Sequence, residues 1–197
     1  MIGPLNQPVR QVRAVTVTAG QAVTINATPS RWFPARLVAP EEQDRPPEPR
    51  AARPHQLVYQ AHNLTGPAVT LRPADRVATV TGTQWELVGP PSAAGDALAA
   101  DVHRVTDLYP VTGLLEEQGG TDVQAGVPIA VWPATGERST DRGVYTEFLG
   151  EAPAEHLAAL TVTNRQLIVG AQKLKIVSAV LHVEVPRVEM ALRRPGG

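Results

Sequence analysis

The segment DRVATVTGTQWELVG, residues 75–89, decides the fold class of this chain. Its two arms, residues 77–81 and 85–88, consist largely of β-branched, aromatic and aliphatic side chains, which favour strands. Gly82 lies between the arms, and glycine tolerates the positive φ that a tight turn requires. The segment therefore predicts a β-hairpin.

Similar strand signals extend in both directions from this hairpin. Val and Thr alternate over residues 12–25, which predicts a second hairpin with one buried face. Residues 32–38 predict an edge strand or a bend, because Pro34 interrupts them. Towards the C-terminus the alternation is strong over 167–192, and Pro186 breaks its phase, which predicts a bulge or an edge position there. Further strands are predicted at 57–59, 127–132 and 144–149.

Two segments predict short helices. Residues 89–104 begin with turn formers and continue as an alanine-rich stretch in which Asp96 is suited to cap a helix of about two turns. Residues 153–160 carry Pro153 at the favoured first turn and Glu155 near the positive end of the helix dipole. The predicted fold class is all-β, with two small β-barrel or sandwich domains in tandem and one or two short helices.

Composition marks the domain boundaries. Residues 40–54, PEEQDRPPEPRAARP, combine prolines with acids and arginines and predict an exposed, extended loop in the first domain. Residues 92–104 follow two prolines and offer few anchoring side chains, so we expect a linker there. The expected organisation is a first β-domain over 1–91, the linker over 92–104 and a second β-domain over 105–197.

The two halves resemble each other in sequence. Each ends in a glycine-turned hairpin, RVATVTGTQWELVG (76–89) and RQLIVGAQKLKIVS (165–178), in which Gly82 and Gly170 are followed two positions later by Gln. The segments at Trp32 and Trp132 also correspond, since each combines tryptophan with Pro and Ala before a polar loop. These similarities predict a tandem duplication of one β-domain.

Charge and composition exclude several classes of function. The chain has 18 Lys and Arg residues against 19 Asp and Glu residues, so its net charge of -1 lacks the basic excess of a dedicated nucleic-acid-binding protein. The absence of cysteine excludes disulfides, thiolate metal sites and cysteine nucleophiles. The longest apolar runs are too short to cross a bilayer, and residues 1–10 lack the apolar core of a secretory signal. We therefore expect a soluble protein made in the cytosol, with no membrane partner.

Motifs for catalysis are missing from the sequence. The histidines do not show the spacing of a zinc-binding helix. No nucleophile elbow, phosphate-binding loop or dinucleotide-binding glycine motif occurs. The adjacent pairs Glu41-Glu42 and Glu116-Glu117 point apart in an extended chain, so they are interpreted as solubilising charges rather than as an acid and base couple. We expect no enzymatic activity, no catalytic residue, no cofactor and no metal site.

The three tryptophans lie in or beside predicted strands. Trp32, Trp85 and Trp132 are interpreted as core or interface residues, because large aromatic side chains usually fill such positions. The alternative is a platform that stacks carbohydrate or peptide. We predict that Trp85 and Tyr145 belong to the core.

The proline-rich loop is a candidate for contact with a neighbouring subunit. Its prolines favour an extended shape, so the loop loses less conformational entropy when it docks. We expect Arg45, Arg50 and Arg53 to pair with carboxylates of a neighbouring copy or of an adjoining ring. The alternatives are a free solvated loop and a ligand for a proline-reading domain.

Residues 70–91, TLRPADRVATVTGTQWELVGPP, resemble the closing hairpin of the head-to-tail joining proteins of long-tailed bacteriophages, the stopper and adaptor connector family. The resemblance rests on an acid before an alternating valine strand, a glycine turn, an aromatic residue followed by an acid and two aliphatic residues, and a final Gly-x-Pro. In this chain these features are Asp75, Val77, Val80, Gly82, Trp85, Glu86, Leu87, Val88, Gly89 and Pro91. The second half is similar to the related adaptor type through Tyr145, the hairpin at Gly170 and the final strand to Arg194.

This resemblance implies a small β-barrel or sandwich whose copies form a homo-oligomeric ring between the portal or adaptor and the tail, around a central DNA channel. Its partners would be other copies of the chain and neighbouring portal, adaptor or tail proteins, in a virion assembled in the bacterial cytoplasm. The near-zero net charge fits a channel through which DNA passes without sequence-specific binding. Alternatives are another virion component, such as a tail terminator or a capsid decoration protein, and a β-rich carbohydrate-binding or hydrolytic module.

Overall fold

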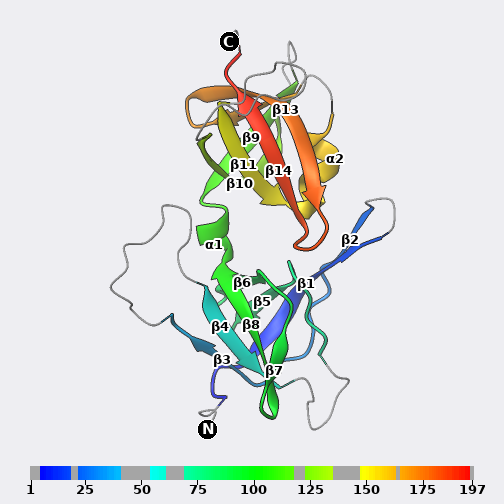
Figure 1. Cartoon of the computed structure of the whole chain (residues 1–197), viewed down its shortest axis with the longest axis vertical. Helices are drawn as coiled ribbons and strands as arrows, with labels where there is room; N and C mark the ends of the chain where they lie inside the picture. Colours follow the sequence, from blue (N-terminus) through cyan, green and yellow to red (C-terminus); the bar gives the residue numbers. More distant parts are fainter. Residues whose placement is uncertain are drawn as a thin grey trace. The chain divides into compact units, whose positions relative to one another are not determined.

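The computed structural model of the chain describes residues 5–18, 22–40, 54–60, 69–117, 123–134, 147–162 and 165–195. The chain divides into two compact units, Met1–Asp107 (unit 1) and Leu108–Gly197 (unit 2). In the described residues both units consist mainly of antiparallel strands, with two short helices and one 3-10 turn (Figure 1). The predicted all-β class, with two domains and short helices, is confirmed.

Unit 1 contains a sheet of eight strands. Backbone hydrogen bonds place them in the order β2-β1-β5-β6-β8-β4-β3, and β7 pairs with β8 beside this path. The strands are β1 (Val9–Val17), β2 (Val23–Asn26), β3 (Ala35–Val38), β4 (His55–Tyr59), β5 (Arg76–Thr79), β6 (Gln84–Leu87), β7 (Ser92–Ala94) and β8 (Ala97–Arg104). The hairpins predicted over 12–25 and 75–89 are therefore confirmed as β1–β2 and β5–β6.

In unit 1, β1 meets the residues just before β3 at a backbone seam. The amide of Phe33, just before β3, donates to the carbonyl of Val9 at 2.8 Å, and the amide of Val9 donates to the carbonyl of Phe33 at 3.1 Å. The amide of Gln7 also donates to the carbonyl of Ala35 at 2.9 Å. β1 and the start of β3 are therefore neighbours, and this isolated bridge closes six strands of the sheet, β1-β5-β6-β8-β4-β3, into a barrel-like ring that leaves β2 and β7 outside.

Unit 2 is a closed barrel in the order β10-β11-β14-β13-β12-β9, in which β9 also pairs with β10. Helix α1 (Val105–Leu108) precedes β9, and the 3-10 turn η1 (Ala154–His156) and helix α2 (Leu157–Leu160) connect β11 to β12. The turn and α2 confirm the helix predicted over 153–160. The strands are β9 (Val111–Glu117), β10 (Val123–Pro133), β11 (Phe148–Pro153), β12 (Arg165–Val169), β13 (Gln172–His182) and β14 (Arg187–Arg193).

The two barrels have the same connectivity. Without β2 and β7, the order around unit 1 is β1-β5-β6-β8-β4-β3, and the order around unit 2 is β9-β12-β13-β14-β11-β10. Counted in chain order within each unit, both are the first, fourth, fifth, sixth, third and second strand. The hairpins predicted to correspond, β5–β6 and β12–β13, occupy the same places, and their turns hold Gly82 at φ 85° and Gly170 at φ 58°. This shared connectivity agrees with a tandem duplication. Trp32 and Trp132 do not correspond, because Trp32 precedes its strand whereas Trp132 lies near the end of β10.

Residues 92–104 are not a linker, contrary to the prediction. They form β7 and β8, and β8 pairs with both β4 and β6 inside the unit 1 sheet. Asp96 caps no helix but lies in the turn between these strands, beside Gly95 at φ 61°. Alanine favours helices in isolation, yet Ala97, Ala99 and Ala100 are buried against neighbouring strands, and this packing overrides the local preference. The first domain therefore ends at Asp107 rather than at 91, and the second begins at Leu108 rather than at 105.

Pro186 does not lie in a strand. It belongs to the turn 183–186 that joins β13 to β14, so the predicted phase slip marks the reversal of a hairpin. The register shift in this hairpin lies instead between Ile176 and Ser178.

Apolar side chains fill the interior of each barrel. In unit 1 the rings of Phe33 and Tyr59 meet edge to face with their centroids 5.7 Å apart, and Trp85 is 4% exposed. The core of unit 2 includes Leu115, Val127, Ile129, Leu160, Leu167, Leu174, Val188, Met190 and Leu192. The prediction that Trp85 is a core residue is confirmed, and Tyr145 lies outside the described residues. In the described part of the chain, no helix is long and apolar enough to cross a membrane.

Candidate functional site

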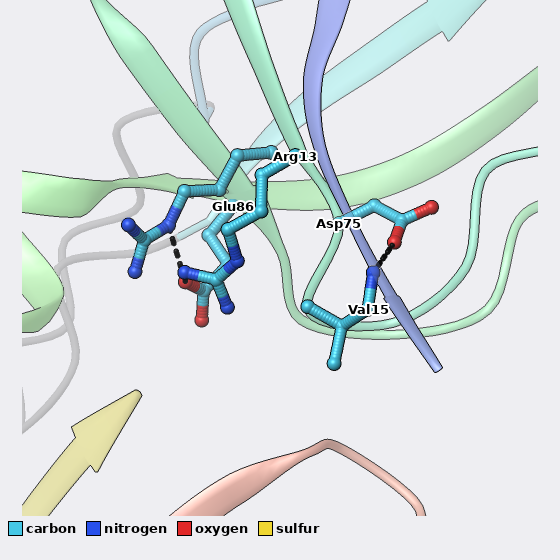
Figure 2. A network of polar contacts seen from close by, with 5 residues as sticks. Arg13, Val15, Asp75 and Glu86 are labelled. Carbon is cyan, nitrogen blue, oxygen red and sulfur yellow. Dashed lines mark hydrogen bonds and ion pairs between the residues drawn. The ribbon is translucent and has the colours of Figure 1, made fainter. Parts of the chain in front are cut away.

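A buried carboxylate, Asp75, joins the start of β5 to β1 in unit 1. Its Oδ1 accepts a hydrogen bond from the backbone amide of Val15 at 2.8 Å (Figure 2). Its Oδ2 accepts from the amide of Arg72 at 2.9 Å and from Nε2 of Gln11 at 2.8 Å. The ladder between β1 and β5 ends at Arg13, while Val15 pairs with Ile25 on β2, so beyond the end of the β5 ladder Asp75 supplies the acceptor for the Val15 amide.

Asp75 is suited to holding the barrel together rather than to proton transfer. Asp75 is 1% exposed, and both of its carboxylate oxygens already accept hydrogen bonds from the protein. Burial raises the pKa of Asp75, and the hydrogen bonds from Val15, Arg72 and Gln11 oppose this rise. A general acid or base has to reach a substrate, which this enclosed carboxylate does not.

A second buried carboxylate, Glu86, lies on β6 between two arginines. Nε of Arg76 donates to Oε2 of Glu86 at 2.9 Å, and Nη1 of Arg13 lies 3.9 Å from the same oxygen. Glu86 is fully buried, although it points to the face of the sheet opposite the core residue Trp85. The three side chains come from neighbouring strands, because Arg76 is opposite both Glu86 on β6 and Arg13 on β1. They form an ion-paired cluster across three strands (Figure 2).

Trp85 is enclosed by side chains from two other strands. The ring of His55 on β4 lies 4.7 Å from the Trp85 ring, measured between centroids, and the guanidinium carbon of Arg104 on β8 lies 5.3 Å from it. Because Trp85 is covered in this way, the alternative interpretation of this residue as a platform for carbohydrate or peptide is wrong.

The other tryptophans differ from Trp85 in exposure. Trp32 is 41% exposed, and the guanidinium carbon of Arg10 lies 5.0 Å from its ring centroid. Trp132 is half-buried. In the described part of the chain, Trp32 is the only exposed aromatic side chain of the Phe, Tyr and Trp types. Among the described residues, the surface at Trp32 therefore presents the most exposed of these aromatic rings.

The arginines proposed for inter-subunit contact, Arg45, Arg50 and Arg53, lie outside the described residues, as does the rest of the segment 41–53. Among the residues that the structure does describe, no group of three His, Asp or Glu side chains is arranged to hold a metal ion. His182 contacts a single carboxylate, that of Glu189, at 3.0 Å on the surface.

Sequence reasoning identified some of these residues and missed others. Asp75, Trp85 and Glu86 were singled out by the hairpin motif, whereas their partners Gln11 and Arg13 were not. Trp32 was interpreted as a core or interface residue, and its exposure of 41% excludes the core. For the outward position of Arg10 the sequence did offer a signal. The alternation of β1 places Arg10 on the face opposite the core residue Val9.

Comparison with known proteins adds no assignment, because no family model, curated protein or solved structure matches the chain. The fold and the outer surfaces of the two units are therefore the features from which a function can be inferred.

Proposed function

We propose that this chain is a structural, non-enzymatic protein of the neck of a tailed bacteriophage. Copies of it form a homo-oligomeric ring between the portal or adaptor and the tail, and DNA passes through the channel of the ring. The observation that carries this proposal is the role of the hairpin that resembles the connector family. Its polar and aromatic residues, Asp75, Trp85 and Glu86, are buried and hold the unit 1 barrel together.

The filled interiors of the barrels support an assembly function. Small barrels have room inside only for their own side chains, and both interiors here are packed with apolar residues. Ligands and partners then have to bind to the outer surfaces. A chain with two such barrels offers two outer surfaces, and a ring needs two different contact surfaces on each copy.

The charge of the chain also supports a channel. A net charge of -1 over 197 residues favours neither tight binding nor repulsion of the DNA backbone. The 16 arginines among the 18 basic residues are suited to protein contacts, because arginine forms bidentate pairs with carboxylates and is enriched in interfaces.

Negative-stain electron microscopy of the purified full-length chain tests this function. We expect closed rings with a central hole. A tail terminator would also form rings, and binding of the rings to tail tubes rather than to DNA-filled heads would favour that alternative. A capsid decoration protein would give no closed rings with a channel. Single small particles whose tryptophan fluorescence changes on addition of oligosaccharides would contradict the neck assignment and favour the carbohydrate-binding module.

A further inference from the structure

Unit 1 carries a basic aromatic patch beside the seam of its barrel, made by Arg10, Arg31 and Trp32. Val9 and Phe33 pair across the seam and point into the core, so their neighbours Arg10 and Trp32 point outwards. The guanidinium carbon of Arg10 lies 5.0 Å from the Trp32 ring, and Arg31 is exposed next to it. The double hydrogen bond between Val9 and Phe33 fixes the backbone beneath the patch.

The patch is basic because of the composition of its segment. Residues 1–40 contain four arginines and no aspartate or glutamate. One of these arginines, Arg13, pairs with the buried Glu86, whereas Arg10 and Arg31 are on the patch. Tryptophan and arginine are the side chains that most often dominate the energy of protein interfaces. The patch therefore has the chemistry to bind an apolar group flanked by carboxylates.

Unit 2 carries a surface with that chemistry at the turn between β13 and β14. Val180 is 55% exposed and Val183 is 57% exposed, and Glu184 is exposed beside them. Glu189 lies opposite Val180 in the hairpin with its side chain 39% exposed, and it contacts His182 at 3.0 Å, so Glu184 is the acid at the turn itself. Arg187, the first residue of β14, is mostly buried, with its Nη1 3.8 Å from Glu151. The exposed charges of this hairpin tip are therefore mainly acidic.

We infer that the β13–β14 tip of one copy docks on the patch of Arg10, Arg31 and Trp32 of a second copy. The inference rests on the proposed ring and names the contact that builds it. Val180 and Val183 cover the Trp32 ring, and Glu184 pairs with Arg31 at the edge of the contact. Because the two surfaces differ, the contact is head to tail, and repetition of it closes a ring when the rotation per copy allows.

Charge reversal on each side of the contact provides the test. Arg31→Glu and Glu184→Arg each place like charges opposite one another in every contact between identical copies. We expect each variant alone to associate at least about tenfold more weakly than the wild type, because juxtaposed like charges are unfavourable in interfaces. Association is measured by sedimentation velocity over a concentration series. Asp96→Arg is the matched control, since it reverses an acidic charge, as Glu184→Arg does, at an exposed turn outside the contact.

An equimolar mixture of the two variants gives the more specific result. The acidic patch of the Arg31→Glu variant then meets the basic tip of the Glu184→Arg variant, and the unchanged patch of the second variant meets the unchanged tip of the first. Both contacts between unlike copies are favourable, so we expect the mixture to regain association that neither variant shows alone. Circular dichroism melting of each variant verifies that the fold is intact.

Three results would overturn the inference. Wild-type rings that neither substitution weakens would leave the ring proposal standing and remove this contact. Weak association of each variant without recovery in the mixture would show that Arg31 and Glu184 act within one chain or on another partner. Loss of DNA binding by the Arg31→Glu variant would identify that partner as nucleic acid. A wild-type chain that stays monomeric at every concentration would overturn both the inference and the proposed function.

Discussion

Asp75 and Glu86 are both buried carboxylates, but different groups compensate for their burial. Two backbone amides and one side-chain amide, all neutral, donate to Asp75, whereas Glu86 is paired with the charged side chains of Arg76 and Arg13. Sequence reasoning could identify both acids as part of the hairpin motif. It could not identify the Val15 amide as a partner, because that contact depends on where the ladder between β1 and β5 ends, 60 residues away in sequence.

Asp75→Asn should lower the free energy of unfolding of unit 1 by about 1 to 3 kcal/mol, which is the cost of leaving a buried polar group without a partner. The amide group of Asn replaces one acceptor oxygen by a donor, and this donor faces either the Val15 amide or the donors of Arg72 and Gln11. Urea denaturation measures the change. Asp96→Asn, at an exposed turn, is the control and should have little effect; an equal loss for both variants would contradict the role of Asp75.

Trp85→Ala should destabilise unit 1 by about 3 to 5 kcal/mol, through lost burial and a cavity where its ring lies beside His55 and Arg104. Trp32→Ala is the matched substitution at an exposed site and should change the melting temperature much less. Thermal unfolding of both variants measures the difference. Comparable effects would show that Trp85 contributes no more to the core of unit 1 than an exposed tryptophan does.

Tyr59 gives unit 1 a sensitivity to alkaline pH. Burial raises the pKa of Tyr59 to about 12, and the charge of Asp75 adds to the rise. The neutral phenol is therefore favoured in the folded state, so its contribution is complete below pH 10 and is lost as the pH rises towards 12. At about 1.4 kcal/mol per pH unit, the loss approaches 2 to 3 kcal/mol. Tyr59→Phe should reduce the fall in stability between pH 10 and 12, and an unchanged pH profile would contradict this assignment.

At the scale of elements, the hairpin over 75–89 and the segment 92–104 show what a local pattern can predict. The hairpin was predicted because alternating side chains and Gly82 carry the information within 15 residues. Strand β8 was missed because its alanines show no alternation, and only pairing with β4 and β6 makes it a strand. The turn at 183–186 was misinterpreted for a related reason, because Pro186 is compatible with a bulge as well as with a hairpin reversal.

Truncation tests the corrected domain boundary. A fragment of residues 1–107 retains all strands of unit 1, whereas a fragment of residues 1–91 lacks β7 and β8 and leaves β4 and β6 without a shared neighbour. We expect the longer fragment to melt cooperatively and the shorter one to be unfolded or aggregated, as followed by circular dichroism. Cooperative melting of the shorter fragment would restore the linker interpretation.

At the scale of the whole molecule, the repeat of one connectivity in two barrels is the main structural result. The two glycine-turned hairpins, which occupy equivalent places, indicated this repeat in the sequence. The predicted correspondence of Trp32 with Trp132 was wrong because β10 extends much further than β3. The basic aromatic patch could be predicted only in part, because the alternation of β1 places Arg10 on the outer face but does not place Trp32 beside it. The exposure of Trp32 follows from the seam between β1 and β3, which joins residues that are neighbours only in the folded barrel.

Native mass spectrometry of the full-length chain tests the central claim of a ring most directly. The chain has a mass of 21.0 kDa, so a ring gives one dominant species at a single integer multiple of that mass. We predict such a species at micromolar protein concentration, with intermediate oligomers becoming visible when the protein is diluted. A spectrum that contains only the 21.0 kDa monomer at every concentration would contradict the proposed assembly.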